Sequence, residues 1–425
     1  MSLSPRAGAP ALHRGLIIVI AACCGVTVMN IYLAFPLITL FAQSFGVSTA
    51  AAANVATISQ VGYAIGLFFL IPLGDVVRRK RLLIVLIVGA TLGLVVASLA
   101  PDLGTLTAAT FVLSALTVAP HVLIPLLVTV IPEHHRGRAL ATVNAAMTTG
   151  IATSRVGGAW LGEVAGWHWV YAAAACATCV VGLVTIVVIP KEERRPSIRY
   201  LALLASTVSL LKTEARLRWS VGLQVPVFAT FNLIWAMMIL LLTGAPYSLP
   251  VAVAGLFGLF GLAPLLTARL VGRVLDARGP TFLIGWGVCI LLGATVVFQF
   301  SLLHVGIVIA GIVLLTLGQQ AASIGNQSRT LGLRADARSR LNTLYMTSNF
   351  LGGSAASAVA VIVYAQYGWP GVTATALVTA LCAVGVWAVD TRRQARAAEA
   401  AISYSVSSER KPLGSSNAQD SNRTH

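Results

Sequence analysis

The sequence predicts an all-α membrane protein with twelve transmembrane helices in two six-helix, pseudo-symmetric halves around a central cavity. Three observations predict it. Hydrophobic residues make up 57% of the 425 positions and charged residues only 10%, whereas soluble domains carry roughly 25% charged residues. Basic residues gather in alternate connections between apolar runs, and the second half of the chain repeats features of the first.

Twelve apolar runs are long enough to cross a bilayer, because a spanning helix needs about 20 residues. Lipid cannot satisfy backbone hydrogen bonds, so each run is expected to be helical. The first run is not expected to be a cleaved signal peptide, because it is too long and many further apolar runs follow it. The expected spans are 15–42, 50–73, 82–100, 105–131, 139–163, 167–189, 219–244, 250–272, 281–300, 303–325, 340–365 and 370–390.

The distribution of lysine and arginine predicts the orientation. Apart from Arg155, these 29 residues occupy both terminal segments, the connections after spans 2, 4, 6, 8 and 10 and the adjacent span ends, whereas the opposite connections contain none. Only Arg155 lies deep within a span. The positive-inside rule then puts both termini in the cytoplasm of a multi-pass protein of the plasma or inner cell membrane. Topology thereby explains the net charge of +16, and no nucleic-acid partner is expected.

The longest internal connection divides the chain into two bundles. Its residues 198–215 form an amphipathic pattern with Leu201, Leu204 and Val208 on the apolar side, which is typical of a helix lying on the membrane surface. The C-terminal tail is rich in Ser and Asn and is expected to be disordered. The expected parts are a cytoplasmic segment 1–14, a bundle 15–189, a cytoplasmic linker 190–218, a bundle 219–390 and a cytoplasmic tail 391–425.

An internal repeat relates the two bundles at an offset of 202 residues. A parallel repeat of this kind arranges two bundles about an axis along the membrane normal, with a cavity near the midplane. The repeated features are Asn30 with Asn232, Arg136 and Arg138 with Arg338 and Arg340, Gly150 with Gly352, and Gly166-Trp167 with Gly368-Trp369.

The connection after span 2 carries a motif. Residues 71–80 resemble the Gly-x-x-x-Asp-Arg-x-Gly-Arg-Arg pattern of the major facilitator superfamily, with matches at Asp75, Arg79 and Lys80. Ile71, Val76 and Arg78 depart from that pattern, and a second copy at residues 272–279 keeps both glycines and Asp276. Asn30-Ile31-Tyr32 and the segment 340–346 are similar to bacterial exporters of the drug and sugar-efflux type.

The resemblance implies a secondary active transporter that works by alternating access, most simply an exporter of small organic molecules. It implies a small-molecule substrate, a lipid bilayer around a monomeric protein, protons as the candidate coupling ion, and neither a metal nor a cofactor. It also implies a latch that joins the two halves on the cytoplasmic side, where a carboxylate at a helix end pairs with basic groups. The latch residues are Asp75, Arg79, Lys80, Asp276 and Arg278.

Polar side chains on the central spans are the candidate lining of the substrate cavity. Amides and phenols suit neutral or mixed polar ligands, although hydrogen bonding between helices explains any single one equally well. His121 follows Pro120 in span 4 and is a candidate for carrying a proton or for a structural bond. The candidates are Asn30, Tyr32, Gln60, Tyr63, His121, Arg155, Asn232, Trp235, Gln319, Gln320, Tyr345 and Asn349.

Arg155 replaces the proline of the family's antiporter motif in span 5. It lies about 24 Å along a core of about 30 Å, so it is expected to face protein or water rather than lipid. No Asp or Glu lies deep in a predicted span, which argues against proton-driven export. An importer or facilitator of an anionic metabolite is therefore the alternative.

The sequence offers little for two other classes of protein, an enzyme and a receptor. The sequence has no phosphate-binding Gly-x-x-x-x-Gly-Lys loop and no His-Glu-x-x-His motif, so an enzyme is not expected. Cys176 and Cys179 lie in an apolar run without a neighbouring His or acid, so they predict no metal site. A transporter-like membrane receptor is the non-transport alternative, although the chain carries no large soluble module.

Overall fold

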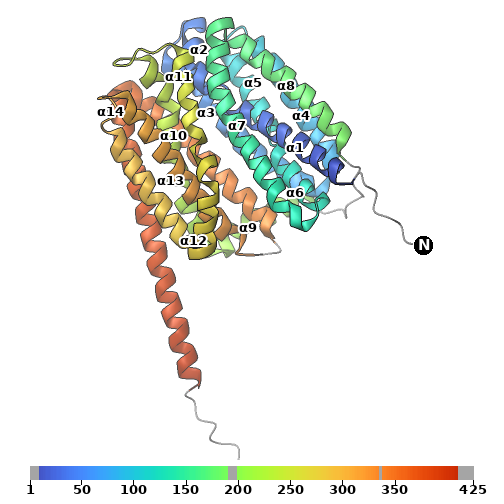
Figure 1. The fold of residues 1–425 in the computed structure, drawn as a ribbon, viewed down its shortest axis with the longest axis vertical. Helices are drawn as coiled ribbons and strands as arrows, with labels where there is room; N and C mark the ends of the chain where they lie inside the picture. The colour runs from blue at the N-terminus through green and yellow to red at the C-terminus, as the bar shows by residue number, and fades with distance from the viewer. Residues whose placement is uncertain (1–8, 190–198, 335–336, 410–425) are drawn as a thin grey trace, which may run out of the picture.

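The computed structural model describes residues 9–189, 199–334 and 337–409, and all regular structure in these ranges is helical (Figure 1). The first half supplies α1 (Ala9–Tyr32), η1 (Phe35–Leu37), α2 (Ile38–Phe45), α3 (Thr49–Val76), α4 (Arg79–Ser98), α5 (Leu103–Leu116), α6 (Ala119–Val130), α7 (Glu133–Ala165) and α8 (Trp167–Val188). After α9 (Tyr200–Thr213) come α10 (Ala215–Thr243), α11 (Val251–Leu256), η2 (Phe257–Leu262), α12 (Ala263–Phe298), α13 (Val305–Leu331) and α14 (Arg338–Glu409).

The helices account for the predicted spans. Within the described ranges, nine helical segments are long and apolar enough to cross a membrane. Two of them, Val251–Phe298 and Arg338–Arg396, each contain two predicted spans, because the chain turns at the non-helical Gly279 or Gly368. The remaining predicted span falls in α7, whose 33 residues are less apolar than the others. The predicted all-α membrane fold is confirmed.

The predicted internal repeat is visible in the backbone. Gly166 and Gly368 both have positive φ, at +94° and +62°, and each joins two consecutive spans. A buried tryptophan, Trp167 or Trp369, follows each glycine. Because only glycine adopts such φ values without strain, the two halves change direction by the same device at equivalent points.

Close approach of helices within a half depends on glycine. A Cβ atom on Gly150 of α7 would lie 2.1 Å from the carbonyl oxygen of Gly25 on α1. A Cβ on Gly66 of α3 would lie 2.0 Å from the carbonyl oxygen of Ala115 on α5. Membrane helices pack through such small residues, since lipid provides no hydrophobic drive for their association.

The helical bundle has two ends. The linker side is the end at which α9 lies, and the far side holds the connections at 46–48, 99–102, 166, 244–250, 299–304 and 367–369. In Figure 1 the linker side is at the bottom, with α1 and α4 to α8 on one flank and α10, α12, α13 and α14 on the other.

The two halves are joined on the far side by α7 and α11. The carboxylate of Glu163, near the end of α7, accepts a hydrogen bond from the backbone N–H of Ala252 at the start of α11. Further along, Gly255 packs so closely that a Cβ there would lie 2.3 Å from the Cβ of Ala159. These contacts close the far side of the interface between the halves.

The linker helix α9 packs on the bundle by one side only. Leu210 is buried with Leu217, Leu341 and Leu344 of the second half, and the Tyr200 hydroxyl donates to the carbonyl oxygen of Phe69 at 2.7 Å. Leu201 and Val208 remain exposed. The exposed apolar side is what a helix at a membrane surface needs.

The tail differs from its prediction. Disorder was expected from residue 391, but α14 continues to Glu409, beyond the rest of the bundle (Figure 1). Residues 395–401 alternate alanine with a few charged residues, and alanine, arginine and glutamate are strong helix formers. Residues 410–425 lie outside the described residues.

Candidate functional site

A hydrogen bond between two buried amides joins the halves near the middle of the bundle. Gln60 of α3 donates through Nε2 to Oδ1 of Asn232 on α10 at 2.7 Å. Asn232 in turn donates to the carbonyl oxygen of Phe228 at 3.0 Å. Gly353 of α14 lies against this pair, since a Cβ there would be 2.8 Å from the Gln60 and Asn232 amides. Three helices from both halves therefore meet at one polar point.

One turn further along α3, Tyr63 connects to both halves. Its hydroxyl lies 2.9 Å from Nε2 of His121 on α6. Its ring packs edge-on against Phe350 of α14, with centroids 4.6 Å apart. Gln60 and Tyr63 thus share the face of α3 that is turned toward the other half. His121 thus makes a contact between two helices, which is the structural role expected as one of its two alternatives. Its role in carrying a proton stays a prediction.

Arg155 on α7 is buried among aromatic rings. Only 8% of it is exposed. Its Cζ atom lies 3.5 Å from the ring centroid of Trp235 and 5.8 Å from that of Tyr32. No carboxylate in the described ranges forms an ion pair with it, since Glu163 binds Ala252 instead. The guanidinium faces protein, not lipid.

The space beside Arg155 is a cavity between the two halves. Its volume is about 30 Å³, far below the roughly 300–1,000 Å³ of small-molecule sites, so the halves lie close together around Arg155. α7 and η1 contribute from the first half, and α10, α11 and η2 from the second. The lining residues are Phe35, Pro36, Arg155, Trp235, Met238, Ile239, Leu242, Ala254, Gly255 and Gly258.

A second polar group lies within the second half around Gln224. Tyr345 donates to Oε1 of Gln224 at 2.6 Å, and Nε2 of Gln224 donates to Asn349 at 2.7 Å and to Ser323 at 2.9 Å. Gln319 donates to the same Ser323 hydroxyl at 3.0 Å. Gln224 was not among the predicted site residues, although an amide in an apolar span was the available signal.

The remaining predicted cavity residues lie apart from these groups. Asn30 is buried and donates to Thr178 of α8 at 3.0 Å, a contact inside the first half. Gln320 on α13 is half-buried beside Gln319. Asn30 has the environment of a residue that joins two helices of one bundle.

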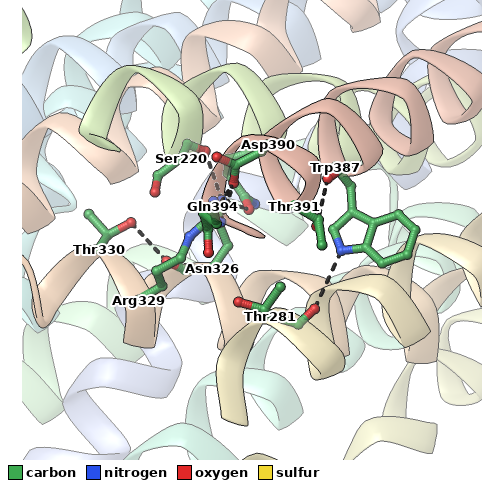
Figure 2. Close-up of polar contacts among 10 residues, drawn as sticks. Ser220, Thr281, Asn326, Arg329, Thr330, Trp387, Asp390, Thr391 and Gln394 are labelled. Carbon is green, nitrogen blue, oxygen red and sulfur yellow. Dashed lines mark hydrogen bonds and ion pairs between the residues drawn. The ribbon is translucent and has the colours of Figure 1, made fainter. Parts of the chain in front are cut away.

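An ion pair that was not predicted lies at the linker side of the second half. Figure 2 shows Arg329 of α13 paired with Asp390 of α14, close to Asn326 and Gln394. Arg329 also donates to Oδ1 of Asn326 at 3.0 Å, and Gln394 donates to Asp390 at 3.0 Å. In the sequence Arg329 belongs to the basic residues after span 10 that indicate orientation, so its ion pair was not predicted.

The predicted latch residues lie on the linker side. Lys80 donates to the carbonyl oxygen of Ile189, at the end of α8, at 3.2 Å. Arg278 is exposed, with Cζ 4.7 Å from the ring centroid of Phe282 on its own helix. Arg79 is buried at the start of α4 and Asp276 is exposed on α12, while the side chain of Asp75 lies outside the described residues. The contacts of Lys80 and Arg278 stay within their own halves.

Comparison with known proteins agrees with this architecture. The family model of the Major Facilitator Superfamily matches residues 20–354. The chain belongs to the major facilitator superfamily. It is 35% identical over 358 residues to the probable transporter SCO4007 of Streptomyces coelicolor, covering 84% of this chain and 83% of that protein. It is 31% identical to the uncharacterized transporter YgaY of Escherichia coli K12, covering 88% and 95%.

Solved structures of transporters share the fold. The POT family transporter PepTSo superposes with a TM-score of 0.67 at 12% identity, covering 88% of this chain and 96% of that one. The nucleoside transporter NupG superposes with a TM-score of 0.67 at 12% identity, covering 88% and 98%. At such low identity the likeness shows the fold alone. The chain is thus a multi-pass membrane transporter of the superfamily.

Proposed function

We propose that this superfamily member is a secondary active transporter that exports small organic molecules by alternating access. The observation that carries the proposal is the Gln60–Asn232 hydrogen bond of 2.7 Å between the halves, next to the Tyr63–His121 contact and the Arg155 cavity. A polar, breakable junction between two repeated bundles is what a molecule needs if its halves separate around a central site.

A contact between the halves on the far side supports the same mechanism. Lys80 and Arg278 make their described contacts within their own halves, while Glu163 and Ala252 join the halves on the far side. Alternating access requires that the two ends close in turn. A far-side contact of this kind must form in one state and break in the other.

A second candidate function is import or facilitated movement of an anionic metabolite. Arg155 favours it, because this buried cation has no carboxylate partner in the described ranges. The two candidates share the cavity and differ in direction and in the charge of the substrate.

Transport by membrane vesicles tests the proposal. Small molecules that raise the melting temperature of the purified protein would first be selected from neutral, cationic and anionic compounds, since a ligand of the folded state stabilises it by mass action. We expect everted vesicles to accumulate at least one selected compound when energised. Accumulation only in right-side-out vesicles would favour import, and movement in neither would overturn the transport function.

A matched pair of glutamine variants ties transport to the junction. Gln60→Leu removes the hydrogen bond to Asn232 and should slow transport at least several-fold while leaving the protein inserted. Gln43→Leu makes the same chemical change at an exposed position of α2 and should leave the rate unchanged. Equal rates in the two variants would remove the junction from the mechanism.

A further inference from the structure

The Arg155 cavity presents hydrogen-bond donors that no described residue satisfies. The guanidinium of Arg155 contacts the ring face of Trp235. It donates no hydrogen bond to any residue that the structure describes. The indole Nε1 of Trp235 is buried and also has no acceptor. An arginine side chain has five N–H donors and an indole ring has one, and neither group has an acceptor. An unsatisfied buried donor such as the Trp235 N–H is costly, so the site lacks a partner that accepts hydrogen bonds.

The charge of the site sets the sign of that partner. Arg155 is the one charged residue among the described residues that line the cavity. A cationic ligand would be repelled, and a neutral one would leave the guanidinium charge uncompensated in a poorly solvated place. A carboxylate has the planar two-oxygen geometry that matches the guanidinium fork. The partner is therefore a single anionic head.

The remaining walls describe the body of the ligand. Phe35, Met238, Ile239 and Leu242 are apolar, and the rest of the lining is small or aromatic apart from Arg155. The cavity volume of about 30 Å³ leaves room for a carboxylate head, and a compact apolar body fits between these walls only once the halves move apart. A ligand with several hydroxyl groups or a second charge would find no polar group to pair with there.

The backbone of η2 holds the arginine in place. A Cβ on Gly258 would lie 2.7 Å from the Cβ of Arg155, and a Cβ on Gly261 would lie 3.3 Å from its Nη1. The helix therefore packs onto Arg155 with no side chain between them and presses it against Trp235. A guanidinium fixed before the ligand arrives loses little side-chain entropy on binding.

We infer that Arg155 and Trp235 bind the carboxylate of a small monocarboxylic acid whose compact apolar body lies against the apolar walls when the halves move apart. This inference rests on the proposed function, because it names the substrate class of the same transporter. It selects an organic anion over the cationic or neutral compounds that an exporter of small molecules would otherwise carry.

The test uses the full-length protein in detergent and matched probes. 4-Methylpentanoate, phenylacetate and indole-3-acetate are titrated beside their amides, which have the same shape without the charge. We expect saturable stabilisation by at least one acid and none by its amide. Arg155→Gln should weaken binding about 10-fold or more, since a charged hydrogen bond is lost. Arg155→Lys, which keeps the charge without the fork, should fall between it and the wild type.

Two further variants separate binding from folding. Trp235→Phe keeps an aromatic face against Arg155 but removes the indole N–H, so it should weaken acid binding by a few-fold only. Arg393→Gln is the matched control, because Arg393 also stacks on a tryptophan, with Cζ 5.0 Å from the Trp219 ring centroid, but at an exposed site. It should bind the acid as the wild type does.

The outcomes distinguish the inference from the proposed function. Acids and amides that bind equally, acids that all fail to bind, or undiminished affinity in both folded Arg155 variants would overturn the carboxylate site. If other compounds are still transported in those cases, the transport function stands alone. If an acid binds through Arg155 but is not moved across vesicles, the site stands and the transport function fails.

Discussion

Arg329 and Asp390 form an ion pair that is largely withdrawn from solvent, with side chains 13% and 8% exposed. Removing one partner leaves the other charge uncompensated in a poorly solvated place. Asp390→Asn should therefore lower the free energy of unfolding by roughly 3 kcal/mol, the effect expected for breaking a buried pair. Adding Arg329→Gln should recover much of that loss, because no unpaired charge remains. Denaturant unfolding in micelles measures both variants.

An exposed ion pair supplies the control. Arg334 and Glu214 are 3.7 Å apart, with side chains 43% and 28% exposed, and such pairs contribute about 1 kcal/mol or less. Glu214→Gln should accordingly change stability little. A loss as large as that of Asp390→Asn would show that burial is not what makes the α13–α14 pair important.

Single residues were predictable when they were chemically unusual for their surroundings. Arg155, Gln60 and Asn232 stand out because a charge or an amide is rare in an apolar span. Their partners were not predictable, because helix rotation decides which side chains meet. The stacking of Arg155 on Trp235 depends on η2, which packs onto α7 next to both side chains. Gln224 gains its central position only once α13 and α14 flank it.

At the scale of helices, close packing of α1 on α7 depends on Gly150. A Cβ there would lie 2.1 Å from the backbone oxygen of Gly25, and a backbone atom cannot turn away as a side chain can. Gly150→Ala should push the helices apart and destabilise the protein by about 1–3 kcal/mol. Gly137→Ala on the same helix meets no atom within 4 Å. It should be neutral or stabilising by up to about 1 kcal/mol, as thermal unfolding would show.

The number and order of the spans were predictable because lipid permits little except apolar helices. Helix ends were less predictable. The linker-side turn in α12 and the far-side turn in α14 each take a single non-helical glycine, so helix continues almost directly across them. In span 4 the break between α5 and α6 precedes Pro120, which lacks the backbone N–H that a continuous helix would use.

At the scale of the whole molecule, the bias of basic residues fixes a testable orientation. In a variant without the six native cysteines, a membrane-impermeant thiol reagent added to intact cells should label Gln366→Cys on the far side. Arg216→Cys, exposed on the linker side, should react only after the membrane is opened. Labelling of Arg216→Cys in intact cells would reverse the predicted orientation of both termini.

A second feature at the scale of the whole molecule is the contact that joins the two halves on the far side. The carboxylate of Glu163 meets the N-terminal end of α11 through the Ala252 N–H, where the helix dipole favours negative charge. Asp102 on the same side offers a comparison, since it caps only its own helix, α5. The backbone N–H and then the hydroxyl of Thr105 donate to it, which lowers the pKa of its carboxyl below the ordinary value.

Removing the Glu163 carboxylate should therefore open the far side. Spin labels at Trp169→Cys and Leu303→Cys, both exposed and in different halves, report the separation across that end. A charge at an exposed helix end contributes about 0.3–1 kcal/mol. Glu163→Ala should therefore raise the population of the longer label-to-label distance, relative to the shorter one, by about two- to five-fold. Asp102→Ala should weaken α5 locally without changing the distance distribution, since its bonds do not cross between halves. If both variants shift the distribution alike, or neither does, the contact between α7 and α11 does not hold the far side closed.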